Sequence, residues 1–359
     1  MLRFSTCSRR HLTPDRVIGA FVFPEAWNDI SRFRELLASF RERGVNAILT
    51  ESETYETAAI DAAHDLGLHF YAGIACFSDH ATKFQSLTER PELWPILENG
   101  ERRPVMEWYI GISPTDRRHQ EKILATIRSI AADHPIDGLF LDFIRWPVHW
   151  EIEFRPGRAR PLDSSFDATT LAQFEQTFGM LPKPAAAASR AAWIRERCYR
   201  AWVDFKCKVV TEFVWEARSC LKLVKPEAVL GIYVAPEVDG LTEPLTGQRL
   251  GDLAPAVDWV SPMLYHNILL RSPSWIGAAL AEVVGVAGPK TLPVIQADSN
   301  RDPDLAADWG PPMSDADWSA TLAEIAARSD IAGMVVFPGM SLIGNSRGGA
   351  LRTMVDKWR

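Results

Sequence analysis

The residues best placed for chemistry are a carboxylate, an arginine and a tryptophan that follow one apolar segment. Asp142 closes the run Gly-Leu-Phe-Leu at positions 138–141, and Arg145 and Trp146 come shortly after it. A segment this apolar is typical of a strand covered on both faces in a parallel sheet, so a carboxylate at its end must be held by partners or used. Asp142 is therefore the first candidate for a catalytic group.

Other apolar segments also end in acidic or aromatic residues. In chain order these further candidates are Trp27, Glu51, Trp108, Glu237, Tyr265, His266 and Asp298. Metal-dependent hydrolases need several converging imidazoles, but His80 and His266 are isolated in the sequence, so we expect no metal. Since no strand-end lysine suits a Schiff base and the cysteines are not grouped, we expect no cofactor either.

A pair of carboxylates among aromatic rings is what cleavage of a glycosidic bond requires. One acid protonates the leaving oxygen, and the other attacks the anomeric carbon or activates water. We predict Asp142 as nucleophile or charge stabiliser, kept ionised by Arg145, and Glu237 as general acid/base. Strand tips about 4.8 Å apart suit the roughly 5 Å carboxylate spacing of retaining enzymes, and side chains that diverge would widen the gap to that of inverting enzymes. The expected partner is a carbohydrate substrate.

Each assignment has a plain structural alternative. Asp142 and Arg145 would then form a structural ion pair, and Glu237 would be an exposed loop carboxylate, with Asp239 or Glu243 equally eligible as the second acid. The substrate-binding candidates have alternatives too. Tyr265 and His266 are then ordinary buried polar groups, Asp298 belongs to a turn, Glu51 opens a helix, and Trp27, Trp108 and Trp146 pack in the core.

The elements that must position these residues alternate between strand and helix patterns along the whole chain. The predicted strands are Arg16–Pro24, Val45–Thr50, Leu68–Phe77, Ile136–Ile144, Ala228–Ala235, Val257–Tyr265, Thr291–Gln296 and Ile331–Pro338. The predicted helices are Asp29–Arg43, Glu53–Leu66, Arg117–Ala132, Arg190–Leu223, Ser274–Ala287 and Asp315–Ser329, with a short helical turn near Leu250–Ala256. Eight strands alternating with helices predict one (β/α)8 barrel over residues 1–359, whose chemistry lies at the carboxyl ends of the strands.

Two connections in this pattern are long, the βα loops after the third and fourth strands at residues 78–113 and 148–189. Loops of this length inside a compact domain usually carry function or a small substructure of their own. In a barrel both lie on the catalytic face, where they would wall a cleft. The alternative is surface decoration without a role.

Part of the sequence resembles a known group of proteins. The segment Asp137-Gly-Leu-Phe-Leu-Asp-Phe-Ile-Arg-Trp-Pro147 is similar to the fourth-strand motif DGxxxDxIRxP of glycoside-hydrolase-like (β/α)8 barrel families. The segment at 108–114 resembles the third region of the same families, which leads into the helix ahead of the fourth strand, and the segment at 247–265 resembles their sixth-strand region. The resemblance implies a glycosidase barrel with Asp142 as the fourth-strand acid. It gives less support to Glu237, because related groups place their second acid on the fifth, sixth or seventh strand.

The composition of the chain argues against several other classes of protein. The net charge of −7 and the absence of a concentrated basic stretch argue against nucleic-acid binding. No segment reaches the length of a membrane span or of a signal-peptide core, so we expect a soluble cytoplasmic protein, although a secreted protein lacking its signal would look the same. Five widely spaced cysteines without a CxxC argue against a disulfide framework.

Two rival functions fit the same barrel. One is a protein that binds a saccharide without cleaving it. The other is an isomerase or lyase acting on a phosphorylated sugar, because the stretch 344–349 after the eighth strand is rich in glycine. Substitution of the catalytic acids separates the first rival from a hydrolase.

Overall fold

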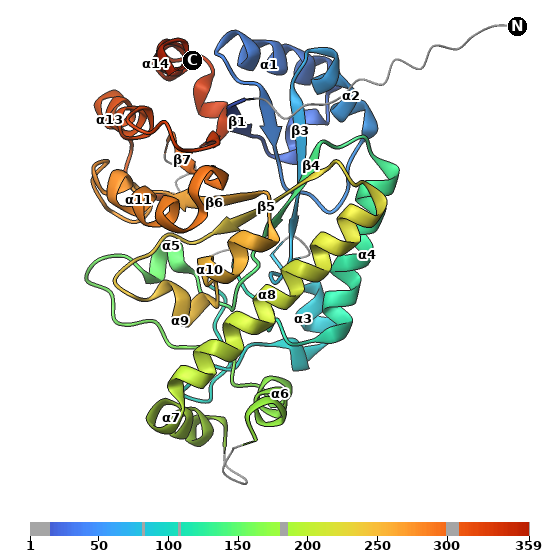
Figure 1. Cartoon of the computed structure of the whole chain (residues 1–359), viewed down its shortest axis with the longest axis vertical. Helices are drawn as coiled ribbons and strands as arrows, with labels where there is room; N and C mark the ends of the chain where they lie inside the picture. Colours follow the sequence, from blue (N-terminus) through green and yellow to red (C-terminus); the bar gives the residue numbers. More distant parts are fainter. Residues whose placement is uncertain (1–14, 81–82, 107–108, 180–185, 299–308, 359) are drawn as a thin grey trace, which may run out of the picture.

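The computed structural model describes residues 15–80, 83–106, 109–179, 186–298 and 309–358. Eight parallel strands form a closed barrel in sequence order, and helices surround it (Figure 1). The strands are β1 (Val17–Phe21), β2 (Ala47–Leu49), β3 (His69–Ala75), β4 (Gly138–Asp142), β5 (Val229–Val234), β6 (Trp259–Leu264), β7 (Val294–Gln296) and β8 (Gly333–Phe337). The predicted (β/α)8 barrel and all eight of its strands are confirmed.

The helices follow the expected alternation, but one predicted helix is divided in two and several further helices are present. They are α1 (Ile30–Glu42), α2 (Thr57–Asp65), α3 (Gln85–Glu89), α4 (Arg117–Asp133), α5 (Trp150–Glu153), α6 (Ala168–Phe178), α7 (Ala187–Arg197), α8 (Tyr199–Val224), α9 (Thr242–Thr246), α10 (Leu250–Leu253), α11 (Trp275–Ala287), α13 (Asp315–Ala326) and α14 (Ser346–Trp358). The helix predicted over 190–223 is broken at Cys198, whose φ of −150° and ψ of 34° are not helical. The helices α3, α5, α6, α9 and α14 were not predicted.

Short 3-10 turns complete the connections. They are η1 (Pro24–Trp27), η2 (Pro91–Leu93), η3 (Ala254–Ala256), η4 (Gly288–Lys290) and η5 (Gly339–Leu342). The turn η3 follows α10, where the sequence predicted a short helical turn.

The strands divide their side chains between two buried layers. Alternate residues such as Leu49, Tyr71, Phe140 and Trp259 fill the inside of the barrel, because successive side chains of a strand point to opposite faces. The residues between them pack outward against the helices, as does the buried face of α1 with Phe33 and its neighbours. The barrel interior is thus a packed, largely apolar core.

The two long connections pair with each other. Leu97 and Ser164 form an antiparallel bridge, the Glu98 amide donates to the Asp163 carbonyl at 2.9 Å, and the Phe166 amide donates to Ile96 at 2.7 Å. Helices α6 and α7 of the fourth connection lie at one end of the molecule, opposite to α14 (Figure 1). The described part of the connection after β4 therefore packs on the connection after β3.

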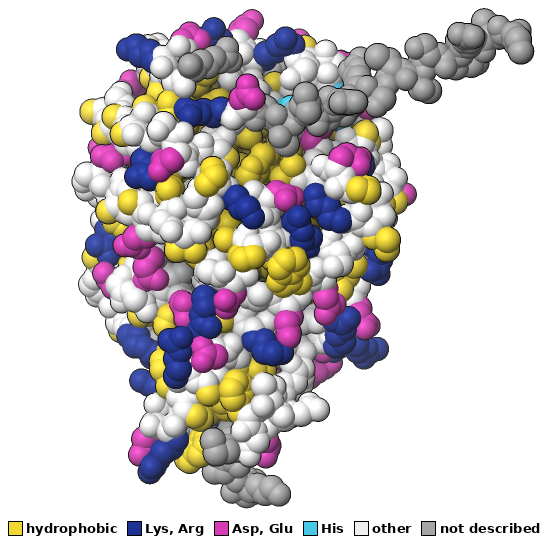
Figure 2. Space-filling view, in the orientation of Figure 1, with side chains coloured by type: hydrophobic (Ala, Val, Ile, Leu, Met, Phe, Trp, Pro, Cys, Tyr) yellow, Lys and Arg dark blue, Asp and Glu magenta, His cyan; other side chains and the backbone are white. Residues whose placement is uncertain are grey.

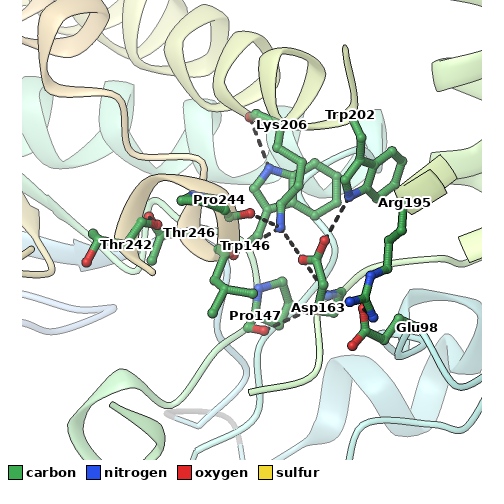
Figure 3. Close-up of polar contacts among 12 residues, drawn as sticks. Glu98, Trp146, Pro147, Asp163, Arg195, Trp202, Lys206, Thr242, Pro244 and Thr246 are labelled. Atoms are coloured by element: carbon green, nitrogen blue, oxygen red, sulfur yellow. Dashed lines mark hydrogen bonds and ion pairs between the residues drawn. The ribbon is translucent and has the colours of Figure 1, made fainter. Parts of the chain in front are cut away.

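A buried ion pair anchors this part of the chain to α8. Lys206 and Asp163 are fully buried and their charged groups lie 2.5 Å apart. The Lys206 ammonium also donates to the carbonyls of Pro244 and Leu245, and the Trp202 indole donates to Asp163 (Figure 3). The fourth connection, α8 and α9 meet at this cluster.

Several expectations from composition can be compared with the described residues. Within them, no helix is long and apolar enough to cross a membrane, and the cysteines at positions 76, 198, 207 and 220 are free thiols. Basic and acidic side chains are interspersed over the face shown in Figure 2. That face carries no broad patch of one sign.

Candidate active site

Two carboxyl groups meet at the carboxyl end of the barrel, across β3. Asp142 ends β4, opposite Ala75 in the strand register, and Glu51 follows the inward residues of β2 at positions 47 and 49. Their side chains hydrogen-bond to each other. The inward residues of β3 between them are Gly73 and Ala75, and these small residues leave room for the contact. A Cβ on Gly73 would lie 2.2 Å from the Thr50 carbonyl oxygen, so this strand position requires glycine.

The pKa of Asp142 is raised well above its usual value. Burial is the largest cause, because it disfavours the charged form, and the neighbouring Glu51 carboxylate adds repulsion; Arg145 opposes both effects. A proton on Asp142 removes this repulsion and can be donated to Glu51 in their hydrogen bond. His80 lies on the other side of Glu51, with its Nε2 3.3 Å from Oε1. Asp142 is thus suited to donate a proton.

The residue after Asp142 adopts an unusual backbone conformation. Phe143 has a φ of +50°, in the left-handed region that bulky residues rarely occupy. Its amide donates to the Asp142 carboxylate at 2.6 Å. Such strained positions concentrate at functional sites, since only strong surrounding contacts maintain them. Here the strain fixes the direction of the carboxyl group.

Arg145 connects Asp142 to a third carboxylate. Its side chain is 1% exposed, and its guanidinium nitrogens lie 3.9 Å from Asp142 Oδ1 and 4.0 Å from Glu151 Oε1. The guanidinium carbon lies 4.5 Å from the centre of the Phe143 ring and 5.5 Å from that of Tyr109. None of its three nitrogens has a hydrogen-bond partner among the described residues. The guanidinium is therefore held by charge and by aromatic faces.

Glu151 has the opposite electrostatic environment to Asp142. Burial opposes its ionisation, but the hydrogen bond and charge of His149, together with the charge of Arg145, outweigh burial and lower the pKa of Glu151. The His149 Nδ1 lies 3.3 Å from Glu151 Oε2. Glu151 lies in α5, a four-residue helix inside the fourth connection. Two acids of opposite pKa shift thus flank one guanidinium.

Tyr265 contributes a phenol to the same group of residues. Burial raises its pKa, and Asp142 and Glu151 are the next largest causes, so its hydroxyl lies near both acids. Tyr233 on β5 has a raised pKa for the same reasons, burial first and Asp142 second. Of the predicted site residues, the structure brings together Asp142, Arg145, Glu51 and Tyr265.

Glu237 contacts the backbone of its own turn. Its side chain is exposed, and its carboxylate accepts from the Gly240 amide at 2.7 Å, which stabilises the turn ahead of α9. Partial desolvation by the surrounding protein raises the pKa of this otherwise exposed carboxyl group, and Glu282 is the neighbouring charge that contributes. Asp142 is not among the causes of this shift. Both residues follow adjacent strands of the barrel, but the turn directs Glu237 to its own backbone.

The remaining predicted residues have other surroundings. Trp146 is fully buried, and its indole donates to the Lys206 carbonyl at 3.0 Å (Figure 3). Trp27 packs against Phe33 in the outer layer. Both lie in the core and differ from the expectation that they stack on sugars, because they point outward from the barrel toward the helices. Trp108 lies outside the described residues.

His266 and Asp298 also take part in the support of the fold. His266 is 2% exposed, and burial lowers its pKa to about 4, against the opposing charge of Asp317 on α13. Asp298 forms an ion pair with Arg347 on α14. Since Arg347 also donates to the Met313 carbonyl at 2.7 Å, Asp298 ties the end of β7 to the last helix.

The glycine-rich stretch at 344–349 is used for packing. A Cβ on Gly348 would lie 2.3 Å from the Leu342 carbonyl oxygen. The Ser346 hydroxyl donates to Asp315 at 2.6 Å and the Arg347 amide to Asn345 at 3.0 Å. The Ser346 hydroxyl and the Arg347 amide at the start of α14 therefore already have hydrogen-bond partners within the protein. The rival prediction of a phosphate site gains no support there.

Among the described residues, no group of three or more His, Cys, Asp or Glu is arranged to hold a metal ion. The acids described above are held by an arginine, by histidines and by each other. Their arrangement can transfer a proton and present an ionised carboxylate within one buried cluster.

Comparison with known proteins finds similarity in structure alone. No family model matches the chain, and no curated protein sequence matches it. The glycoside hydrolase domain of PgaB (BpsB) from Bordetella bronchiseptica is similar with a TM-score of 0.69 and 15% identity, over 95% of this chain and 99% of that chain. The catalytic domain of β-amylase from Paenibacillus polymyxa is similar with a TM-score of 0.67 and 12% identity, over 97% and 100%.

A β-galactosidase from the Antarctic haloarchaeon Halorubrum lacusprofundi also matches, with a TM-score of 0.67 and 14% identity. The match covers 95% of this chain but 58% of that chain. At such identities the similarity establishes the fold. The barrel of this chain is the one that these carbohydrate-active proteins use.

Proposed function

We propose that this protein is a glycoside hydrolase in which Asp142 is the general acid and Glu151 the second carboxylate. The observation that carries the proposal is the pair of buried acids on one guanidinium, with pKa values moved in opposite directions. Two carboxyl groups with such different environments are what glycosidases use to divide the two roles. The similarity in fold to glycoside hydrolases is consistent with it.

The reaction follows from the protonation states. Asp142, protonated because of its raised pKa, donates its proton to the glycosidic oxygen as the bond from that oxygen to the anomeric carbon breaks. Glu151, ionised because of its lowered pKa, either bonds to the anomeric carbon or takes a proton from the water that does. This assignment differs from the sequence-based one, which made Asp142 the nucleophile or charge stabiliser and Glu237 the general acid/base.

Glu51 has a supporting role in this scheme. Acids that hydrogen-bond to each other are too close to stand on either side of a glycosidic bond, which needs at least about 5 Å between carboxyl groups. Asp142 and Glu51 are in such contact, so they act as one proton-holding unit. Arg145 separates this unit from Glu151.

Amide variants test the proposal against its rivals. Asp142→Asn and Glu151→Gln are each assayed on a panel of p-nitrophenyl glycosides and oligosaccharides, with Glu237→Gln as the matched control. We expect kcat to fall about 10² to 10⁴-fold in the first two and to change less than about threefold in the control. Large losses in Asp142→Asn and Glu237→Gln, with Glu151→Gln close to the parent, would restore the pair predicted from the sequence.

Two further outcomes decide against hydrolysis by these residues. If the parent protein hydrolyses no member of the panel but binds one, the protein is a saccharide-binding barrel. If hydrolysis survives both Asp142→Asn and Glu151→Gln, the chemistry lies elsewhere.

Proton NMR of the first-formed sugar anomer then assigns the role of Glu151. Retention of configuration, the outcome predicted from the sequence, makes Glu151 the nucleophile of a glycosyl-enzyme intermediate. Inversion makes it the base that activates water. Recovery of activity in Glu151→Gln on addition of azide gives an independent test. The azide ion would take the place of the missing carboxylate and attack the anomeric carbon from the same face of the sugar.

A further inference from the structure

Aromatic rings gather where β8 and β1 end, beside the carboxylates. Phe337 lies 5.2 Å from Phe21 and 5.9 Å from Phe23 between ring centres, both edge-on. Phe21 and Phe23 lie 5.5 Å apart. We call these three residues the aromatic shelf. They come from the ends of two neighbouring strands, since β1 pairs with β8 in the closed barrel.

One ring of the aromatic shelf is open to solvent. Phe23 is 41% exposed, whereas Phe21 is 8% exposed. The difference follows from the strand pattern, because Phe21 is the last inward residue of β1 and Phe23 lies two residues beyond the end of the strand. Pro24 follows it and favours an extended backbone at Phe23, where ψ is 149°. The chain therefore presents an aromatic face at the rim of the barrel.

The aromatic shelf is continuous with the candidate active site. The Phe337 ring stacks on Tyr265, with centres 5.0 Å apart and an interplanar angle of 20°. Tyr265 in turn has its hydroxyl near Asp142 and Glu151. The route from the acids to the exposed Phe23 ring thus passes through two rings in contact. The end of the barrel has an acidic half over β2 to β4 and an aromatic half over β8 and β1.

We propose that the aromatic shelf is a second sugar-binding subsite, so that the substrate is an oligosaccharide bound across the end of the barrel. The inference rests on the proposed hydrolase function. A pyranose ring has an apolar face of C–H groups that packs on an aromatic face, while its hydroxyl groups remain in water at the rim. A single ring flanked by a carboxylate cluster matches a sugar unit next to the bond that is cleaved.

The size of the feature favours a sugar over a protein. A stable protein interface buries about 800 Å² on each partner and needs a group of exposed apolar residues. At the end of β1, Phe23 alone among the three shelf residues is widely exposed. One exposed ring beside a reaction centre suits one pyranose unit.

The test compares Phe23→Ala with Phe23→Trp and with Val286→Ala. Val286 on α11 is 52% exposed and provides a matched loss of exposed apolar surface. Each variant is assayed on cello-, malto- and chito-oligosaccharides of two to six units and on the corresponding p-nitrophenyl monosaccharides. Binding of the same oligosaccharides is measured by calorimetry in the Asp142→Asn background, where the substrate is not consumed.

We expect Phe23→Ala to raise KM and the dissociation constant for oligosaccharides about fivefold to tenfold, with p-nitrophenyl monosaccharides changed less than about twofold. Phe23→Trp should retain or tighten oligosaccharide binding, and Val286→Ala should match the parent. If Phe23→Ala behaves as Val286→Ala while Asp142→Asn still abolishes hydrolysis, the subsite is wrong and the proposed function stands. If the parent neither hydrolyses nor binds any oligosaccharide, both are wrong.

Discussion

Arg145 is the residue on which the proposed chemistry depends most directly. A buried guanidinium without hydrogen-bond partners among the described residues costs stability, and this one faces two acids at distances slightly beyond hydrogen bonding. Its charge lowers the pKa of both Asp142 and Glu151. At Asp142, burial and the Glu51 charge outweigh Arg145 and raise the pKa. At Glu151, His149 acts in the same direction as Arg145, and together they outweigh burial and lower the pKa.

Arg145→Met should move the whole pH profile of hydrolysis upward. Without the cation, the pKa of Glu151 rises, so the loss of activity on the acid side begins at higher pH. The pKa of Asp142 rises too, so the loss on the basic side is also delayed. We expect kcat/KM at the optimum to fall about 10- to 100-fold, measured over pH 3 to 9, with Arg145→Lys showing smaller shifts. Unchanged limbs in Arg145→Met would contradict the role of the guanidinium.

Glu51→Gln should move one limb in the opposite direction. The Glu51 charge is the second cause of the raised pKa of Asp142, so its removal lets Asp142 lose its proton at lower pH. The basic limb then shifts downward, while the acid limb, set by Glu151, stays in place. We expect the maximal rate to stay within about tenfold of the parent. An upward shift of the basic limb would show that Glu51 does not repel Asp142.

At the scale of residues, the sequence predicts part of the site. Asp142, Glu51 and Tyr265 lie at strand ends, where a strand pattern specifies both position and direction, and the structure brings them together. Glu151 was not predicted because it belongs to a four-residue helix whose position depends on the tertiary contacts of the fourth connection. The pair of acids at 151 and 153 after Trp150 was the available signal. Glu237 also follows a strand, but its side chain bonds to a local turn that the strand pattern does not predict.

At the scale of elements, the eight strands were predictable because short apolar runs that alternate with helix patterns are typical of a parallel sheet. The contacts between the two long connections were not, because pairing across about seventy residues leaves no local trace. The buried cluster around Lys206 and Asp163 holds these segments together (Figure 3). By fixing the fourth connection on α8, it also fixes the segment that carries Glu151.

Lys206→Met should destabilise the protein by about 3–5 kcal/mol, because it leaves the Asp163 carboxylate buried without its cation. Urea unfolding followed by circular dichroism and tryptophan fluorescence measures the loss. The double variant Lys206→Met with Asp163→Leu should recover part of it, since no unpaired charge remains. Lys208→Met is the control, because its pair with Glu212 is exposed and contributes about 0.5 kcal/mol or less. Equal effects of the two lysine variants would contradict the account.

At the scale of the whole molecule, carboxylates at the two ends of the barrel respond differently to folding. Asp137, just ahead of β4, accepts from His64 at 2.9 Å and from the Phe70 amide at 2.7 Å. Burial opposes its ionisation, but these hydrogen bonds and that of His69 outweigh burial and lower the pKa of Asp137. Asp142 at the other end has a raised pKa. Ionisation of Asp137 at one end of the barrel therefore stabilises the folded protein, whereas ionisation of Asp142 at the other end destabilises it.

Asp137→Asn and Asp142→Asn should consequently change the free energy of unfolding with opposite signs. The lowered pKa of Asp137 adds stability that is present above the unfolded value of about 3.9 and disappears as pH falls through the folded value, so Asp137→Asn should cost about 1–3 kcal/mol at pH 7. The raised pKa of Asp142 costs stability as pH rises from about 3.9 to its folded value, so Asp142→Asn should gain about 0.5–2 kcal/mol at pH 7. Urea unfolding at pH 3 to 8 measures both, and destabilisation by Asp142→Asn at pH 7 would mean that its carboxyl group supports the fold rather than a reaction.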